Sequence, residues 1–209
     1  MRCTTNHCFP VSGRGKEAKV RVSIVAQLLN LWTVTVGIFR LIIDQVKQRV
    51  NPAQCQFMSV IDIRWAFNLI EILESVRART TFYGPGGRLY WYKRMPFGLK
   101  NAPACWQAFV SSILEGIPNV IVFVDDIFLF SPTVEAHLEL LQRIIDVFKE
   151  YNIPVRWQKI QLLRPTVNFL GAVWNRGGVI QPNVTSLETV DKFPVPLDKK
   201  QLKSFLGVC

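Results

Sequence analysis

Apolar residues recur along the chain with two different spacings, which predicts a mixture of strands and helices. Short β-branched or aromatic runs bounded by turn residues are typical of strands, whereas apolar residues three and four apart are typical of amphipathic helices. Runs of the first kind predict strands at 20–24, 33–36, 57–63, 80–83, 89–92, 155–163, 167–173 and 179–180, and a hairpin at 120–130. Runs of the second kind predict helices at 41–50, 103–115, 133–151, 187–192 and 199–208, with a short helix or turn at 67–74. Residues 1–20 are polar and rich in basic residues and glycine, which favours a loop or a hairpin tip.

Two adjacent carboxylates, Asp125 and Asp126, interrupt the apolar run of the predicted hairpin. Burying an ionised carboxylate is costly unless another group compensates its charge, and two neighbouring like charges disfavour each other's ionisation. A divalent cation would compensate both carboxylates. The alternative is a polar two-residue turn, because aspartate tolerates turn geometry. The local sequence favours neither interpretation over the other.

A third carboxylate, Asp62, lies in another short apolar segment, residues 59–64. Adjacent strands that carry Asp62 and Asp125 would gather three carboxylates, and two divalent ions about 4 Å apart use such a cluster in phosphoryl transfer. Mg²⁺ is commonly held by one or two carboxylates, with phosphates and water completing its shell. On its own, Asp62 is better explained as a strand-end aspartate with a backbone partner.

The composition favours a folded, basic protein with a polyanionic partner. The chain has 209 residues, is 49% hydrophobic and carries a formal net charge of +10. Such a charge favours nucleic acid first and an anionic membrane surface second. The uncharged stretch 23–39 reaches the lower length limit of a membrane span, but its polar residues favour a buried strand, turn and strand. Five scattered cysteines, an odd number, fit free thiols in a reducing compartment.

Several segments, taken in order, resemble the reverse transcriptase domain of gypsy-type LTR retrotransposons. The segment Arg94-Met-Pro-Phe-Gly-Leu-Lys-Asn-Ala-Pro103 is nearly identical to the family's R-M-P-F-G-L-K-N-A-P, and Phe123-Val-Asp-Asp126 matches its Y/F-x-D-D. Later blocks match at His137-Leu, at Asn168-Phe-Leu-Gly171 and at residues 201–209. The matching blocks extend from about residue 10 to the C-terminus, and the long block followed by Asp125 is the most specific of them.

The resemblance implies a two-metal polymerase site. Asp62, Asp125 and Asp126 match the family's three metal-binding aspartates. The implied cofactor is a pair of Mg²⁺ ions, with Mn²⁺ as an alternative. One ion lowers the pKa of the primer 3′-OH, and the other neutralises the triphosphate and the departing pyrophosphate.

The resemblance also implies substrate-binding roles for residues outside the aspartates. Taken alone, Phe67 would be plain core, Gly98 a tight turn, and Arg21 and Lys159 solvated surface charges. The roles that the family carries over are a steric gate against the ribose 2′-OH at Phe67, a surface under the incoming base and template at Phe97, Gly98 and Leu99, a triphosphate contact at Arg21, a proton donor to pyrophosphate at Lys159, and the start of the primer grip at Phe169, Leu170 and Gly171.

The fold implied is α+β, a right-hand polymerase palm made of an antiparallel sheet backed by helices, with partial fingers. We expect partial fingers at 1–56, the palm at 57–182 with a fingers-side hairpin at about 78–95, and the connection to the thumb with its first residues at 183–209. Because the chain stops at Cys209, where the thumb has barely begun, we expect a fragment of a retroelement polyprotein.

The implied function is RNA-directed DNA polymerisation, the transfer of a deoxynucleotide to a primer 3′-OH by a nucleotidyltransferase. The implied partners are an RNA or DNA template with its primer and a deoxynucleoside triphosphate, without a membrane, inside the cell in the cytoplasm, the nucleus or a retroelement particle. Departures from the family, Val25-Ala-Gln27 in place of its D-Y-R and Phe39 and Leu41 in place of prolines, keep open an inactive nucleic-acid-binding remnant. A membrane-associated protein that uses residues 23–39 is a third possibility.

Overall fold

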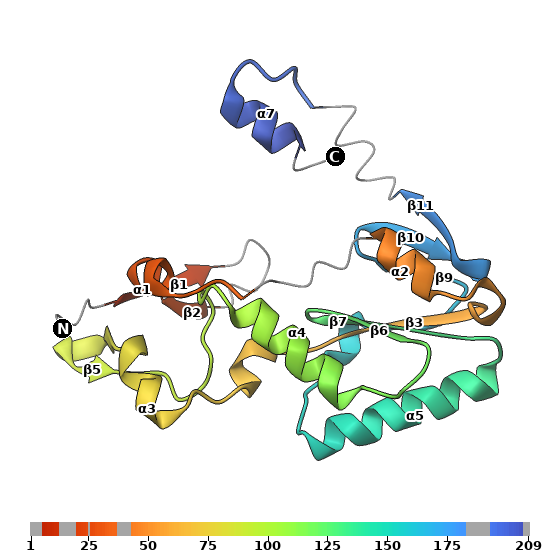
Figure 1. Ribbon diagram of the computed structural model, residues 1–209, viewed down its shortest axis with the longest axis horizontal. Coiled ribbons are helices and arrows are strands. Elements are labelled where there is room, and N and C mark those ends of the chain that lie inside the picture. The colour runs from red at the N-terminus through yellow and green to blue at the C-terminus, as the bar shows by residue number, and fades with distance from the viewer. Residues whose placement is uncertain (1–5, 13–19, 25, 37–42, 183–192, 207–209) are drawn as a thin grey trace. The chain divides into compact units, whose positions relative to one another are not determined.

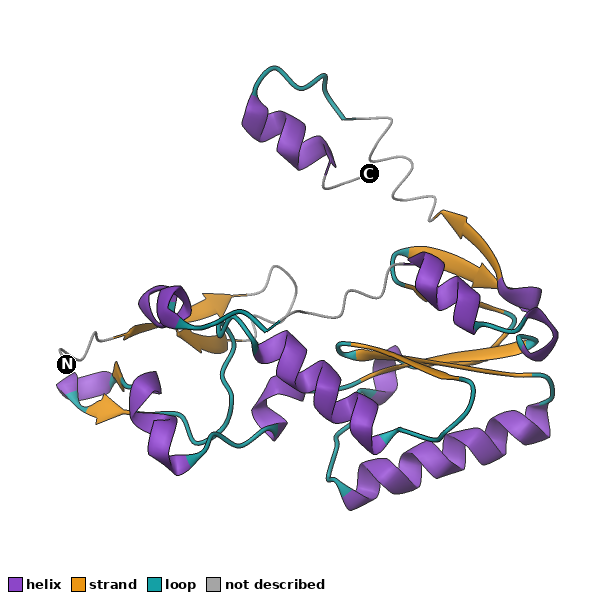
Figure 2. Ribbon diagram, viewed as in Figure 1, coloured by secondary structure: helices purple, strands orange, loops and turns teal. Residues whose placement is uncertain are grey.

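The computed structural model of the chain describes residues 6–12, 20–24, 26–36, 43–182 and 193–206. The chain divides into two compact units, each built from three separate segments. The first unit comprises Met1–Arg40, Ile63–Glu115 and Val147–Val155, and the second comprises Leu41–Asp62, Gly116–Asp146 and Arg156–Cys209. Figure 1 shows the elements along the chain, and Figure 2 shows the same view by type of structure.

The first unit contains a small sheet with the strand order β2-β1-β4-β5. Strand β1 (Asn6–Ser12) pairs antiparallel with β2 (Val20–Ile24) and parallel with β4 (Phe82–Tyr83). Strand β4 in turn forms a hairpin with β5 (Leu89–Tyr90) around a glycine-rich turn at residues 84–87. The helices of this unit are α1 (Gln27–Trp32), α3 (Glu74–Arg77) and α4 (Ala102–Ile113).

The second unit contains two antiparallel sheets. The larger has the order β6-β7-β3-β8, from β3 (Phe57–Asp62), β6 (Val120–Phe123), β7 (Asp126–Ser131) and β8 (Gln161–Arg164). The smaller has the order β11-β10-β9, from β9 (Thr166–Phe169), β10 (Ala172–Asn175) and β11 (Val179–Pro182). Its helices are α2 (Ile43–Arg49), α7 (Lys199–Leu206) and most of α5 (Val134–Glu150).

The central strands β3 and β7 of the larger sheet are buried on both faces. Successive side chains of a strand point to opposite faces, and consecutive residues of both strands are buried. Met58 and Val60 of β3, with Phe128 and Phe130 of β7, belong to one apolar cluster. The rest of that cluster comes mainly from α2 and the smaller sheet, at Val46, Val50, Val167, Phe169 and Trp174. The opposite face contacts α5, whose His137 bonds to both β3 and β7, and Figure 1 shows this helix beneath the sheet.

The predicted α+β class, with antiparallel sheets backed by helices, is confirmed. The hairpin at 120–130 is found as β6 and β7, and the amphipathic helix at 133–151 as α5, with Thr133 Oγ1 accepting a capping bond from the Ala136 amide. The predicted helix at 187–192 lies outside the described residues. The remaining elements that match are β2, β3, β4, β5, β11, α2, α4 and α7.

Three local predictions were wrong. Residues 33–36 form no strand, because the Asn101 side chain bonds the carbonyl of Val34 and the amide of Val36 in place of a neighbouring strand. The predicted strand at 155–163 contains a 3₁₀ turn, Trp157–Lys159, and becomes β8 only at Gln161. The run 167–173 is two strands joined by a tight turn.

For residues 1–20, the prediction left a loop or a hairpin tip open. The antiparallel pairing of β1 with β2 agrees with the hairpin and not with a plain loop.

The uncharged stretch 23–39 is not the buried strand, turn and strand that we predicted. It contains the short helix α1, and Leu31, Trp32 and Val34 are 77%, 87% and 85% exposed. In the segments that the structure describes, no helix has the length and apolar character needed to cross a membrane.

Candidate active site

The adjacent aspartates lie where the β6–β7 hairpin turns. Phe123 pairs with Asp126, so Val124 and Asp125 form the turn and Asp126 begins β7. Val124 has a φ of +50°. This left-handed conformation is unfavourable for a β-branched residue, and such strain gathers at functional sites. The turn interpretation is therefore right for Asp125, and the interpretation of the two carboxylates as metal ligands stays a prediction.

Asp62 lies beside this pair because of the register between β3 and β7. The two strands are antiparallel, and Asp62 is directly opposite Asp126. Side chains directly opposite each other in an antiparallel pair have Cβ atoms about 4.5–5.5 Å apart. The structure therefore brings Asp62 next to Asp126 at one end of the larger sheet, and Asp125 is the residue just before Asp126 in the chain.

The carboxyl group of Asp126 has a pKa raised above its ordinary value. Burial is the larger cause, because it disfavours the charged form, and the negative charge of Asp62 adds to it. The positive charge of Lys159 acts in the opposite direction. The site therefore concentrates negative charge that a cation would stabilise.

Two cationic side chains from the segment after α5 reach Asp62. Arg156 Nη1 lies 2.7 Å from Asp62 Oδ1 and donates a hydrogen bond of 3.1 Å to Oδ2. Lys159 Nζ lies 3.7 Å from Oδ2. The backbone fixes this arrangement, because the amide of Arg156 donates to the carbonyl of Asp62 at 3.0 Å and the amide of Lys159 donates to the carbonyl of Arg156 at 3.0 Å.

The residues present fit a hard divalent cation that is held partly by substrate. Carboxylate oxygens are the ligands that Mg²⁺ prefers, and Asp62 Oδ1 is buried and faces a cationic group, Arg156 Nη1, at 2.7 Å. Among the described residues, no group of three or more histidine, cysteine, aspartate or glutamate side chains is arranged to hold a metal ion. Asp62, Asp125 and Asp126 therefore do not form a complete metal site by themselves, and an ion here would also need oxygens from phosphate or water.

In the first unit, Phe67 contacts Phe97 of the R-M-P-F-G segment. Phe67 lies in the 3₁₀ turn Ala66–Leu69, and the two rings meet edge to face with centroids 5.4 Å apart. Both side chains are half-buried. An aromatic ring held in this way has a fixed position and a partly accessible edge, as a steric gate requires.

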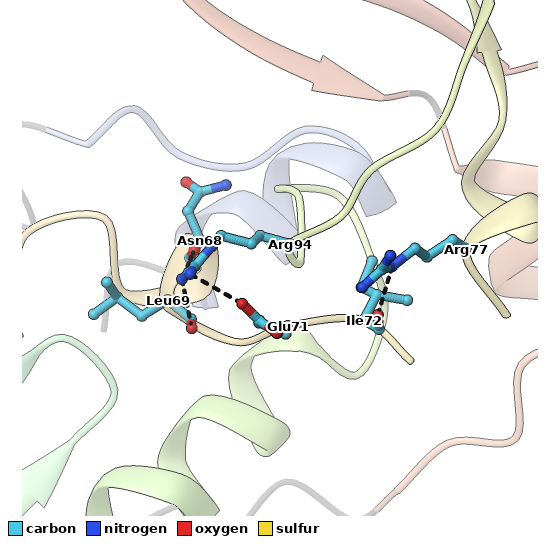
Figure 3. Close-up of polar contacts among 6 residues, drawn as sticks. All are labelled: Asn68, Leu69, Glu71, Ile72, Arg77 and Arg94. Carbon is cyan, nitrogen blue, oxygen red and sulfur yellow. Dashed lines mark hydrogen bonds and ion pairs between the residues drawn. The ribbon is translucent and has the colours of Figure 1, made fainter. Parts of the chain in front are cut away.

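Polar bonds between two segments hold this aromatic pair in place. Arg94 donates to the carbonyls of Leu69 and Asn68 at 3.1 and 3.5 Å and forms an ion pair with Glu71 at 3.1 Å (Figure 3). Asn68 Nδ2 donates to the carbonyl of Met95 at 3.2 Å, and the amide of Met95 donates to the carbonyl of Ile70 at 2.9 Å. The first residue of the R-M-P-F-G segment thus fastens that segment to the residues around Phe67.

Gly98 lies in a turn that Asn30 clamps. Its φ is +99°, which favours glycine. Asn30 Nδ2 donates to the carbonyl of Gly98 at 2.8 Å, and Asn30 Oδ1 accepts from the amide of Lys100 at 2.9 Å. Asn101, the residue before α4, makes no capping bond with its side chain, which instead bonds residues 34 and 36. The sequence block thus owes its shape to a residue nearly seventy positions earlier.

The remaining predicted residues lie elsewhere. Arg21 is on β2, opposite Val11. Phe169 is 2% exposed and stacks on Phe128 at 5.0 Å, so its ring belongs to the core. Leu170 and Gly171 have φ values of +54° and +72° and form the tight turn between β9 and β10. That turn, and not the Phe169 ring, is the part of the segment that could contact a primer.

Sequence reasoning missed Arg156 and Asn30. Arg156 carried no signal, because it lay inside a run predicted as a strand and its contact with Asp62 is a pairing across 94 residues. Asn30 carried a weak signal, as a polar residue in an otherwise apolar stretch, and a buried or clamping role could have been considered for it.

Comparison with known proteins agrees with this geometry. The family model described as reverse transcriptase (RNA-dependent DNA polymerase) matches residues 17–174. The Pol polyprotein from transposon 297 of Drosophila melanogaster is 34% identical over 157 residues, which are 74% of this chain and 15% of that protein. The Pol polyprotein from transposon opus of the same fly is 31% identical over 194 residues, 92% of this chain and 19% of that protein. The chain thus spans a small part of its curated relatives.

Solved structures of similar fold include foamy viral protease–reverse transcriptases bound to nucleic acid. The complex with double-stranded DNA superposes with a TM-score of 0.85 at 25% identity, covering 98% of this chain and 35% of that chain. The complex with an RNA/DNA hybrid gives a TM-score of 0.78 at 25% identity, covering 98% of this chain and 27% of that chain. The predicted polymerase architecture is confirmed by this likeness, and the chain belongs to the reverse transcriptase (RNA-dependent DNA polymerase) family.

Proposed function

We propose that the chain is the RNA-directed DNA polymerase domain of a gypsy-type LTR retrotransposon. The observation that carries the proposal is the register of β3 against β7, which sets Asp62 opposite Asp126 with Asp125 in the adjoining turn. The gypsy assignment is supported by the segment 94–103 and by the similarity to transposon polyproteins.

Asp62, Asp125 and Asp126 would hold two divalent ions, Mg²⁺ or Mn²⁺. When bound, such ions lower the pKa of the attacking 3′-OH and neutralise charge on the triphosphate and the leaving pyrophosphate. The contribution of the protein is to place its carboxylates on a rigid, buried sheet, so that little reorganisation is needed during the reaction. Lys159, close to Asp62 and 61% exposed, is placed to reach a phosphate or to donate a proton to pyrophosphate.

Other residues would select and position the substrates, a template of RNA or DNA with its primer and a deoxynucleoside triphosphate. Phe67 would exclude a ribose 2′-OH, the turn at Phe97 and Gly98 would support the incoming base and template, and Arg21 would contact the triphosphate. The turn at Leu170 and Gly171 would contact the primer, with Phe169 supporting it from the core. The net charge of +10 favours such a polyanionic partner.

The division into partial fingers at 1–56, palm at 57–182 and the connection to the thumb at 183–209 remains a prediction. An intracellular location, in the cytoplasm, the nucleus or a retroelement particle, is part of the same proposal. It agrees with Cys55 and Cys105, which are free thiols. Immunostaining of the tagged chain in expressing cells tests the location.

Primer extension on an RNA template tests the function. In Mg²⁺ or Mn²⁺ we expect the chain to add deoxynucleotides, and Asp125→Asn to abolish incorporation. The same variant should bind an RNA–DNA duplex as tightly as the wild type or slightly more tightly, because it removes negative charge near the phosphates. Unchanged extension by Asp125→Asn would remove Asp125 from the mechanism, and binding without incorporation by the wild type would indicate the inactive remnant.

A further inference from the structure

The position of Arg156 suggests that this side chain affects how Asp62 binds a metal ion. A single guanidinium nitrogen, Nη1, lies 2.7 Å from one carboxylate oxygen and 3.1 Å from the other. This nitrogen lies between both oxygens of the carboxylate, where a cation held by the two oxygens together would lie. In the structure the guanidinium therefore stands in for a cation at Asp62.

The surroundings make this contact stronger than an ordinary surface ion pair. The Asp62 side chain is only 19% exposed and that of Arg156 30%, so solvent screens the pair incompletely. The backbone bond from the Arg156 amide to the Asp62 carbonyl holds the two residues together independently of their side chains.

We propose that Arg156 is the resident counter-cation of Asp62 and competes directly with the divalent ion for that carboxylate. The guanidinium compensates the buried charge of Asp62, which also faces Asp126, when no ion is bound. The same contact weakens the affinity of the site for a divalent ion, because the ion must displace the guanidinium. The inference rests on the metal site proposed above and adds a residue that regulates its occupancy.

Titration of the 209-residue chain with Mn²⁺ tests the competition, with free Mn²⁺ measured by electron paramagnetic resonance. We expect Arg156→Gln to bind Mn²⁺ roughly tenfold more tightly than the wild type, because a partly buried competing charge has been removed. Arg164→Gln is the matched control, since Arg164 is exposed on β8 and makes no ion pair among the described residues. It removes the same charge from the same unit and should change the affinity less than about twofold.

Thermal unfolding in EDTA and in saturating Mn²⁺ gives a second measurement that does not depend on activity. In EDTA, Arg156→Gln should unfold at a lower temperature than the wild type, because it leaves Asp62 without its main counter-charge. In Mn²⁺ it should regain more stability than the wild type does, because the stability that a bound ligand adds grows with the logarithm of its affinity. Arg156→Lys keeps the charge but loses the guanidinium, so its unfolding temperature in EDTA and its gain in Mn²⁺ should lie between those of the wild type and Arg156→Gln.

The outcomes separate this inference from the proposed function. Equal or weaker Mn²⁺ binding by Arg156→Gln, with the same loss of stability in EDTA and in Mn²⁺, would show that Arg156 is only a structural partner and would overturn the inference. Asp62→Asn is the control for the site itself. If that variant binds Mn²⁺ as the wild type does, the metal is not at Asp62, and the proposed catalytic site fails together with the inference.

Discussion

Ser59 and Asp62 are polar residues three positions apart on β3, and their surroundings differ in one decisive respect. Ser59 is fully buried and lies in a closed network: its Oγ accepts from the amide of Leu163 at 2.9 Å and contacts His137 Nε2 at 2.7 Å. Asp62 is partly exposed and interacts with two cationic side chains, Arg156 and Lys159, that solvent also reaches. One polar group is satisfied within the fold, and the other can exchange its partners.

The closed network is complete enough to assign its protons. Ser131 Oγ donates its only hydrogen to the carbonyl of Thr133 at 3.0 Å, so the hydrogen between Ser131 and His137 belongs to Nδ1. His137 Nε2 then accepts from Ser59. A network in which each hydrogen has an acceptor stabilises one arrangement of β3, β7 and α5 and leaves nothing for a ligand. The difference teaches that burial alone does not mark a functional polar residue; exchangeable partners do.

The largest expected effect is the loss of activity when Asp62 of β3 is changed. Asp62→Asn keeps the shape of the side chain but removes the charge that would hold the metal. We expect its rate of nucleotide incorporation in primer extension to fall by roughly a thousandfold or more. Its free energy of unfolding in EDTA should change by about 1 kcal/mol or less, because the lost ion pair is partly offset by relief of the repulsion from Asp126. A large loss of stability with retained activity would reverse the comparison.

In the buried network of Ser59, Ser131 and His137, the expected effect is on stability. His137→Ala removes two hydrogen bonds and leaves a cavity at a fully buried position. The free energy of unfolding in urea should fall by about 3 kcal/mol. Leu138→Ala, at the neighbouring and 50% exposed position of α5, is the control and should cost less than about 1 kcal/mol. Incorporation per folded molecule should stay near that of the wild type for both variants; a specific loss in His137→Ala would link the network to catalysis.

Phe67, a half-buried residue of the first unit, tests whether a partly exposed side chain there also affects the reaction more than the stability of the fold. Phe67→Val should reduce discrimination against ribonucleotides by roughly tenfold to a hundredfold, because the 2′-OH would no longer meet a ring. The measurement is the ratio of incorporation efficiencies for a ribonucleotide and its deoxynucleotide in a chain that shows extension. Phe82→Val is a suitable control, as another half-buried phenylalanine of the same unit with ring contacts of its own. Equal ratios in both variants would return Phe67 to the core.

The sequence indicated a role for Asp62 but not for Ser59, although both lie on β3. Asp62 was identified because a carboxylate inside an apolar run is costly and because its context resembles a family motif. Ser59 and His137 were not, because a serine or histidine in an apolar pattern is compatible with either a core or a surface position, and their pairing spans 78 residues. The same limit applies to Arg156. Local patterns reveal which residues need a partner, but only the register of distant strands shows which partner each one has.

Whether an element depends on local or on distant residues also decided whether it was predictable. The β6–β7 hairpin and α5 were predicted because their apolar periodicity is strong and local. Residues 33–36 were predicted wrongly because a distant side chain, Asn101, satisfies their backbone. The turn at Leu170 was missed because its left-handed φ requires a non-glycine residue to adopt an unfavourable conformation, which no residue pattern indicates.

The smallest expected effect is on the pH dependence of stability, and it distinguishes the closed network most directly. Burial lowers the pKa of His137 below its ordinary value of 6.5. The folded state therefore binds fewer protons at His137 than the unfolded state does as the pH falls through about 6.5. The stabilising contribution of neutral His137 is complete above that pH and is lost as the pH falls from about 6.5 toward the lowered pKa. Protonation of Nε2 would also remove the acceptor that Ser59 uses.

Urea unfolding between about pH 7.5 and 5.5 measures this effect. We expect the free energy of unfolding of the wild type to decrease by up to about 1.4 kcal/mol for each pH unit below the unfolded pKa. His137→Gln is the control, because glutamine can hydrogen-bond but does not titrate in this range. The chain has one other histidine, His7, whose contribution cancels in the difference between wild type and variant. If the two proteins lose stability in parallel as the pH falls, His137 is not titrating between the folded and unfolded states, and the network is less closed than its geometry indicates.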